Sequence, residues 1–104
     1  MIVEERNYGL RPGGVKEYLR IWHECGRQPQ TRHLGDPIGV YQTETGTLNT
    51  LVYLWGFSSW EDRDRRRAAL MADPEFAAFR SQVRALVHSQ QNRILTPASV
   101  MEGD

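Results

Sequence analysis

The segment TLVYLWGF, residues 50–57, carries apolar side chains on both sides of the strand that its β-branched and aromatic residues predict. Side chains of a strand point alternately to opposite faces of a sheet, so this segment has an aliphatic face and an aromatic face. The aliphatic face holds Val52 and Leu54, and the aromatic face holds Tyr53, Trp55 and Phe57. A strand with one face in water usually alternates apolar with polar residues. Both faces of this strand are therefore expected to be buried.

The preceding and following residues predict three more strands and a first helix. Strands are expected at residues 2–10, 38–45 and 87–95, in addition to residues 50–57. Apolar residues at spacings of three and four predict a helix over residues 14–25, which Gly26 would end. Residues 27–37 contain two prolines and are expected to form a polar loop.

A second helical region follows the apolar strand. Ser58 and Ser59 compete for its N-cap, because an acidic residue lies three positions after each of them and would complete a capping box. The Asp-Pro pair at residues 73–74 ends this helix and starts another, since Pro suits the first position of a helix. Residues 96–104 are expected to form a polar tail.

This βαββαβ order predicts a ferredoxin-like α+β fold, in which helices cover one face of an antiparallel four-stranded sheet. The 104 residues suit a single domain, residues 1–104. Because the helices cover only one face, the aromatic residues of the apolar strand would otherwise form an exposed patch of roughly several hundred Å². We expect the bare faces of two sheets to meet instead, which gives a homodimeric α+β barrel.

Charge and composition argue against several kinds of partner. Thirteen basic and thirteen acidic residues give a formal net charge of zero, so the chain has no overall field that would concentrate it on nucleic acid or on anionic lipid. No segment approaches the roughly 18 to 20 apolar residues of a membrane span. We therefore expect no nucleic acid and no membrane as partner. A single cysteine, Cys25, and the lack of a recognisable signal peptide predict a cytoplasmic location.

Five segments follow one another over nearly the whole chain: EERNYGLRPGG, HLGDPIGVYQTETGTLN, LVYLWGF, DRDRRRAALMADPEF and SQQNRIL. In this order they resemble the NIPSNAP-domain family of the dimeric α+β barrel superfamily. The resemblance implies a ferredoxin-like fold and a dimer, and it leaves the activity undefined. Two positions depart from the family pattern. Tyr53 stands where histidine is frequent, so no role of that histidine carries over, and Glu5 occupies an apolar position.

The first strand offers polar residues for a pocket. Alternation places Glu4, Arg6 and Tyr8 on one face, and the family resemblance favours that face for the barrel interior. In the ferredoxin-like order this strand lies beside the apolar strand, which would bring Tyr53 and Trp55 close to them. Further candidates for lining a small-molecule pocket are Glu44 and Gln90. Alternatively, the acid and the arginine of the first strand form an ion pair that only fills a polar core.

The arginine run RDRRR, residues 63–67, is typical of a solvated helical face, because acidic residues alternate with it. Arg63 and Arg67 share one side of the helix and would hold a carboxylate if they reach over the barrel mouth. The histidines at positions 23, 33 and 88 lack metal-ligand spacing, so neither a metal site nor a cofactor is expected.

We expect a homodimer of undefined activity that binds a small molecule between sheet and helices. One alternative is a cofactor-independent or haem-degrading monooxygenase of the dimeric α+β barrel type. Asn7 and Trp60 resemble residues of the haem-degrading enzymes, but no histidine of the second helical region is available to ligate iron. The other alternative is an interaction module with a packed barrel. Catalytic residues are not predicted, so enzyme and binding protein both stay open.

Overall fold

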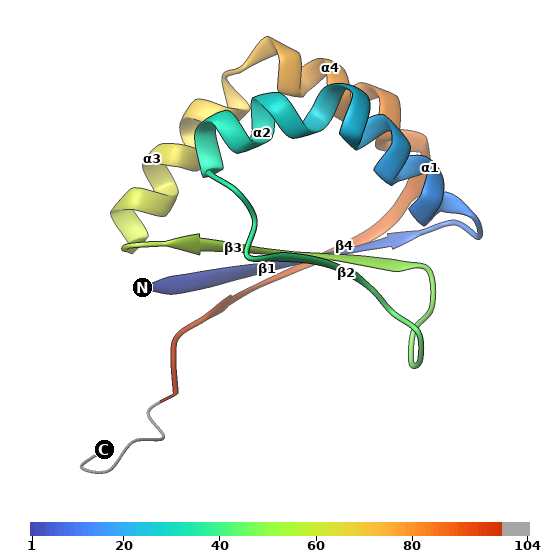
Figure 1. Ribbon diagram of the computed structural model, residues 1–104, viewed down its shortest axis with the longest axis horizontal. Helices are drawn as coiled ribbons and strands as arrows, with labels where there is room; N and C mark the ends of the chain where they lie inside the picture. Colours follow the sequence, from blue (N-terminus) through green and yellow to red (C-terminus); the bar gives the residue numbers. More distant parts are fainter. Residues whose placement is uncertain (99–104) are drawn as a thin grey trace.

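The computed structural model describes residues 1–98, and their elements follow the predicted order with one extended helical segment (Figure 1). The strands are β1 (Ile2–Leu10), β2 (Gly39–Gln42), β3 (Thr50–Phe57) and β4 (Val87–Leu95). The α-helices are α1 (Gly14–Ile21), α2 (Arg27–Leu34), α3 (Trp60–Met71) and α4 (Pro74–Val83). A π-helical turn (Trp22–Gly26) joins α1 to α2, and a 3₁₀ turn (Arg84–Leu86) leads into β4. The predicted polar tail lies outside the described residues from residue 99 onward.

Within residues 1–98 the four strands form one antiparallel sheet in the order β2-β3-β1-β4. Strand β1 is central, so Glu4 lies opposite Trp55 of β3 on one side and Ile94 of β4 on the other. All the helices of the described chain lie on one face of this sheet (Figure 1). The predicted ferredoxin-like α+β fold is therefore confirmed. None of the described helices is long and apolar enough to cross a membrane.

The aromatic face of β3 packs beneath the helices of its own chain. Trp55 is 0% exposed, and Tyr53 stacks on it with 5.8 Å between ring centroids. Trp22, from the π-helical turn, meets Tyr53 edge-on at 5.3 Å. The expectation that these aromatic residues face a second copy is wrong. The helical layer presents aromatic rings of its own, and rings from both layers are needed to fill the space between sheet and helices.

The opposite face of the sheet is the one that nothing in residues 1–98 covers. Val3, Val52 and Leu54 are half-buried there, and three large apolar residues are exposed at its margins. We call the group the open-face patch, and it consists of Val3, Ile38, Tyr41, Val52, Leu54 and Leu95. Within residues 1–98 the half-exposed face of the apolar strand is thus the aliphatic one, and not the aromatic one as the sequence predicted.

The helical segment that begins at Gly14 continues to Leu34, past the loop that was predicted for residues 27–37. Pro29 lies within this continuous segment just after the π-helical turn, where the Arg27 N–H donates to the Trp22 carbonyl, so the proline falls where the helical hydrogen-bond pattern is already irregular. Gly26 does not end the helix. It allows close packing, since a Cβ atom at this position would lie 2.5 Å from Cδ1 of Phe79 on α4.

Local capping signals start the second helical region as predicted. The Ser59 hydroxyl accepts a hydrogen bond from the Asp62 N–H at 3.0 Å, and the Asp62 carboxylate accepts one from the Ser58 N–H at 3.0 Å. Hydrogen bonds from Arg66 and from the Ser58 backbone lower the pKa of Asp62 to about 2. The Asp73 carboxylate accepts from the N–H of Glu75 at the start of α4.

Candidate functional site

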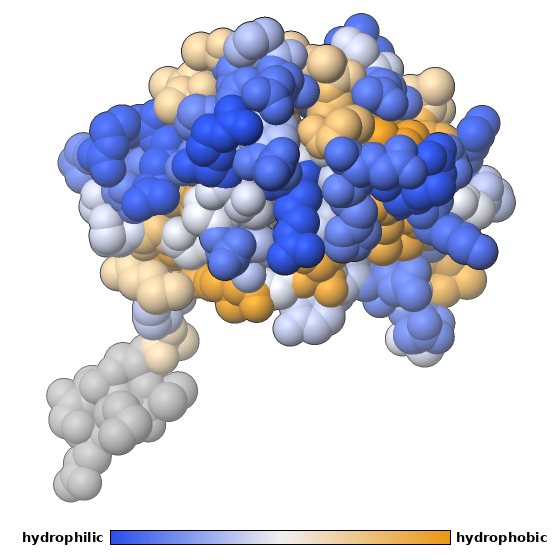
Figure 2. Space-filling model, turned by 45° about the horizontal axis from the view of Figure 1, so that its top comes forward, coloured by the Kyte–Doolittle hydropathy of each residue, from blue (hydrophilic) through white to orange (hydrophobic). Residues whose placement is uncertain are grey.

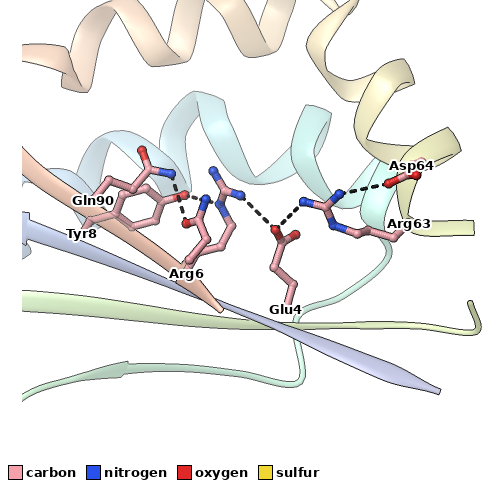
Figure 3. A network of polar contacts seen from close by, with 7 residues as sticks. Glu4, Arg6, Tyr8, Arg63, Asp64 and Gln90 are labelled. Carbon is pink, nitrogen blue, oxygen red and sulfur yellow. Dashed lines mark hydrogen bonds and ion pairs between the residues drawn. The ribbon is translucent and has the colours of Figure 1, made fainter. Parts of the chain in front are cut away.

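A buried carboxylate lies under the helical layer at the N-terminal half of β1. Glu4 is 0% exposed, and its Oε2 accepts hydrogen bonds from Arg6 Nη1 at 3.1 Å and from Arg63 Nη2 at 2.8 Å. Figure 3 shows the two guanidinium groups approaching Glu4 from opposite sides, with Asp64 beyond Arg63 at 3.0 Å. The strand and α3 are thus linked by a charged network that is buried at Glu4 and Arg6 and reaches solvent at Arg63 and Asp64.

Opposing effects act on the ionisation of Glu4. Burial alone would raise its pKa, but the hydrogen bond from Arg63 and the charges of Arg6 and Arg67 outweigh that effect and lower the pKa below its ordinary value. Glu4 is therefore a carboxylate at neutral pH. One of its oxygens, Oε1, has no hydrogen-bond partner among residues 1–98.

Arg6 extends this network toward a cavity. Its Nε donates to the Tyr8 hydroxyl at 2.9 Å, and its guanidinium lies 6.0 Å from the centroid of the Tyr8 ring. Tyr8 in turn stacks on Tyr18 of α1 with 5.8 Å between centroids. Glu4, Arg6 and Tyr8, at alternate positions of β1, therefore form a row that leads from the buried carboxylate to the stacked tyrosine rings.

The cavity has a volume of about 310 Å³ and lies between the sheet and the helices. Its polar lining consists of Arg6, Tyr8, Arg67, Arg80, Arg84 and Gln90. Its apolar and aromatic lining consists of Tyr18, Met71, Phe76, Phe79, Val83 and Val87. The molecular surface on the helical side is largely hydrophilic, with smaller apolar areas between the charged side chains (Figure 2). An apolar wall with a few converging polar groups has the composition of a small-molecule site.

Arg67 is the most unusual of the lining residues. It is partly buried, and within residues 1–98 it forms no hydrogen bond and no ion pair. Burial lowers the pKa of Arg67, and the neighbouring positive charge of Arg6 lowers it further. Arginine nevertheless stays protonated in proteins, so this position holds a positive charge that is incompletely balanced.

A profile of the NIPSNAP family matches residues 3–101. The chain belongs to the NIPSNAP family. It is similar to the protein NipSnap homolog of Dictyostelium discoideum, with 30% identity over 97 residues. That alignment covers 93% of this chain and 43% of the relative, so the NIPSNAP chain described here spans less than half the length of that curated relative.

Solved structures place the fold in the same family. A NIPSNAP family protein with unknown function from Agrobacterium tumefaciens has a TM-score of 0.91 at 38% identity, covering 98% of this chain and 92% of that chain. A putative antibiotic biosynthesis monooxygenase from Nitrosomonas europaea has a TM-score of 0.67 at 11% identity, covering 95% of this chain and 100% of that chain. At this identity the second likeness concerns the fold alone.

The NIPSNAP fold brings together most of the residues that the sequence nominated for ligand binding. Arg6, Tyr8, Arg67 and Gln90 line the cavity. Glu4 and Arg63 lie beside it as ion-pair partners, and Glu4 also pairs with Arg6 at 3.1 Å, which is the pair that the structural alternative described. Tyr53 and Trp55 form the aromatic floor next to these residues and do not line the cavity.

Glu44 is the nominated residue that the structure places elsewhere. Strand β2 ends at Gln42, two residues before it, so Glu44 is exposed in the loop that precedes β3. The sequence prediction extended this strand too far, because QTET alternates like a strand although no neighbouring strand pairs with it beyond Gln42 in the described chain.

Two lining arginines escaped the sequence prediction. Arg80 lies over the Phe76 ring at 5.6 Å, and Arg84 follows it one helical turn later. The signal for them was the spacing of four between two arginines that flank the apolar stripe of α4. Such a pair more often marks a solvated surface. Only the path of α4 over the sheet shows that these two arginines line the cavity.

The residues that suggested haem-degrading chemistry lie away from the cavity. Asn7 faces the open side of the sheet and donates to Glu5 at 2.7 Å, and Trp60 is 52% exposed at the start of α3. Within residues 1–98 no histidine lines the cavity, and no group of three potential metal ligands is found. The described part of this NIPSNAP chain thus offers no support for the haem-degrading alternative.

Proposed function

We propose that this NIPSNAP chain is a cytoplasmic homodimer that binds a small molecule in the cavity between its sheet and its helices. The observation that carries the proposal is the cavity of about 310 Å³, in which aromatic walls meet Arg6, Tyr8 and Arg67. An interaction module with a packed interior would have no reason to keep this space. The positions of Arg6 and Tyr8 are fixed by hydrogen bonds on a central strand, so the site is preorganised.

Blocking the cavity mouth is expected to abolish binding. Met71 lines the cavity and is 46% exposed, so Met71→Trp should fill the entrance with little loss of stability. In calorimetric titrations with naphthalene-sized acids and amides, we expect one site per wild-type chain and binding at least about tenfold weaker for Met71→Trp. Ala78→Trp adds the same ring to the exposed side of α4 and serves as the control. Equal affinity of both variants and the wild type would place the ligand elsewhere.

The open-face patch supports the homodimer. Its half-buried aliphatic residues lie at the centre of the sheet, and a second copy of the same patch would cover them by two-fold symmetry. Glu5 and Arg93 form an ion pair at 2.8 Å on this face and could align the two copies. The proposed dimer contact thus involves the aliphatic face of the sheet, which the helices leave open. The sequence had predicted a contact through the aromatic face instead.

Introducing a charge into the open-face patch is expected to give monomers. Leu54→Lys places an ammonium group at the centre of the patch, and burying that group against a second copy would be costly. Sedimentation velocity should show a wild-type dimer of 12.0 kDa chains and a Leu54→Lys monomer. Ala78→Lys adds the same charge to the helical side and should remain dimeric. A wild-type protein that sediments as a monomer at micromolar concentration would exclude the dimer.

A further inference from the structure

We infer that the cavity selects a small organic anion, with a carboxylate or phosphate group on an apolar body, and that Arg67 binds the charged group. This inference rests on the binding function proposed above and specifies the class of ligand. It follows from the distribution of charge around the cavity, from the hydrogen-bonding capacity that the fold leaves unused there, and from the shape of the apolar wall.

The charges around the cavity are one-sided. Four arginines line it, and none of its lining residues within the described chain is acidic. Glu4 balances Arg6 at 3.1 Å, but Arg67, Arg80 and Arg84 form no ion pair within residues 1–98. The whole chain has a formal net charge of zero, so this excess is local and does not reflect a basic protein. A concave site with one sign of charge concentrates ligands of the opposite charge.

The position of Arg67 is electrostatically unfavourable in the absence of an anion. It lies close enough to Arg6 for the two positive charges to repel each other, and burial removes part of the water that would screen them. Its guanidinium offers donors that no residue within the described range accepts. A carboxylate or phosphate would accept two of these hydrogen bonds in parallel, which is the geometry that guanidinium groups favour. An anion would therefore relieve the repulsion and use the vacant donors together.

Arg6 and Tyr8 are placed to bind the charged group of the ligand together with Arg67. Arg6 is held on one side by Glu4 and on the other by the Tyr8 hydroxyl, so its remaining donors are fixed in direction. Tyr8 and Gln90, on the neighbouring strands β1 and β4, add a hydroxyl and an amide to the same wall. The ligand's charged group would thus meet the guanidinium of Arg67, the oriented donors of Arg6 and the neutral donors of Tyr8 and Gln90.

The apolar wall indicates that the ligand has a body as well as a charge. Phe76, Phe79 and Val83 of α4 and Tyr18 of α1 form this wall and leave room for a ring system or a short chain. A volume of about 310 Å³ fits one small molecule and is too small for a folded segment or a nucleic-acid strand. Inorganic phosphate alone would leave this wall without a contact.

The decisive experiment compares matched probes in the intact protein. Titrations use 2-naphthoate, 2-naphthyl phosphate and the neutral 2-naphthamide, which share the ring system. For the wild type we expect at least one of the two anions to bind about tenfold tighter than the amide. Arg67→Gln should reduce that preference to less than about threefold and leave the affinity for the amide unchanged. The tighter anion identifies the head group.

Arg65→Gln is the matched control for the arginine substitution. Arg65 lies on the same helix, pairs with Asp62 at 2.7 Å and does not line the cavity, so the preference for anions should persist. Arg67→Gln itself should melt no lower than the wild type, because it removes a repulsive charge. If it unfolds instead, Arg84→Gln removes another positive charge, at the exposed rim of the cavity. This variant should still bind anions more weakly than the wild type.

The possible outcomes separate the ligand class from the binding function. Equal affinity of the wild type for the amide and both anions would overturn the anion inference while the cavity remains a binding site. An anion preference that survives Arg67→Gln would overturn the role of Arg67. Failure of all three probes to bind in a manner sensitive to Met71→Trp would count against the binding function itself.

Discussion

Trp55→Ala is expected to lower the free energy of unfolding by about 3 to 5 kcal/mol, as for other large aromatic side chains removed from a core. Trp55 lies at the centre of the sheet, stacks on Tyr53 with parallel rings and is fully buried beneath the helices. Alanine would leave a void that the stiff β3 backbone cannot close. Chemical denaturation measures the change directly, and the melting temperature should fall by at least roughly 10 °C.

Trp55→Phe is the control for this substitution. It retains an aromatic ring against Tyr53 and removes an indole N–H that has no partner within residues 1–98, so its cost should be clearly smaller. Equal losses for both substitutions would mean that the stacking contact contributes little. A melting temperature of Trp55→Ala that matches the wild type would contradict the burial of this face.

Glu4→Gln is expected to destabilise the protein by about 3 to 5 kcal/mol, because it leaves the guanidinium groups of a buried network without their anion. Glu4 accepts from both Arg6 and Arg63 through Oε2, and although a glutamine oxygen could accept the same two hydrogen bonds, the neutral amide would not balance the two positive charges. Urea denaturation at neutral pH gives the free energy. The double substitution Glu4→Gln with Arg63→Gln should recover part of the loss, since it removes one of the two stranded charges.

The effect of Glu4→Gln is expected to depend on pH in a defined direction. The folded protein holds the pKa of Glu4 below its ordinary value of 4.5, so the carboxylate stabilises the fold above that pH. This contribution is lost as the pH falls through the folded pKa, and the difference between wild type and variant should narrow below pH 4.5. Glu17→Gln, which breaks an exposed ion pair with Arg20, should change stability little at any pH. A gap of constant size down to acidic pH would show that Glu4 is not ionised in the fold.

Elements that depend on a few neighbouring residues were predictable. The Asp73-Pro74 break and the cap at Ser59 follow from side chains that reach their own backbone. The extension of the first helical segment through Pro29 was not predictable, because proline and glycine in a polar stretch indicate a loop. Packing decides otherwise, since Gly26 admits the Phe79 ring and Gln30 accepts a buried hydrogen bond from Trp22 at 2.6 Å.

Alternation along β3 predicts two apolar faces, but it does not show which of them packs under the helices. The aromatic face went to the helices because their inner side carries aromatic rings, a match that no single segment reveals. The grouping of Arg6, Tyr8 and Gln90 followed from strand order, and Arg67 joined them through helical spacing. Arg80 and Arg84 were missed because their place depends on the route of α4 across the sheet.

Gly26 limits the size of the cavity, although it does not line it. The Phe79 ring lies directly against this residue, and a methyl group there would push the ring toward the cavity that we propose as the binding site. The dimensions of this cavity can therefore change through one position on the π-helical turn that is not among the lining residues. Two proteins with identical lining residues but different residues at position 26 would then have cavities of different size.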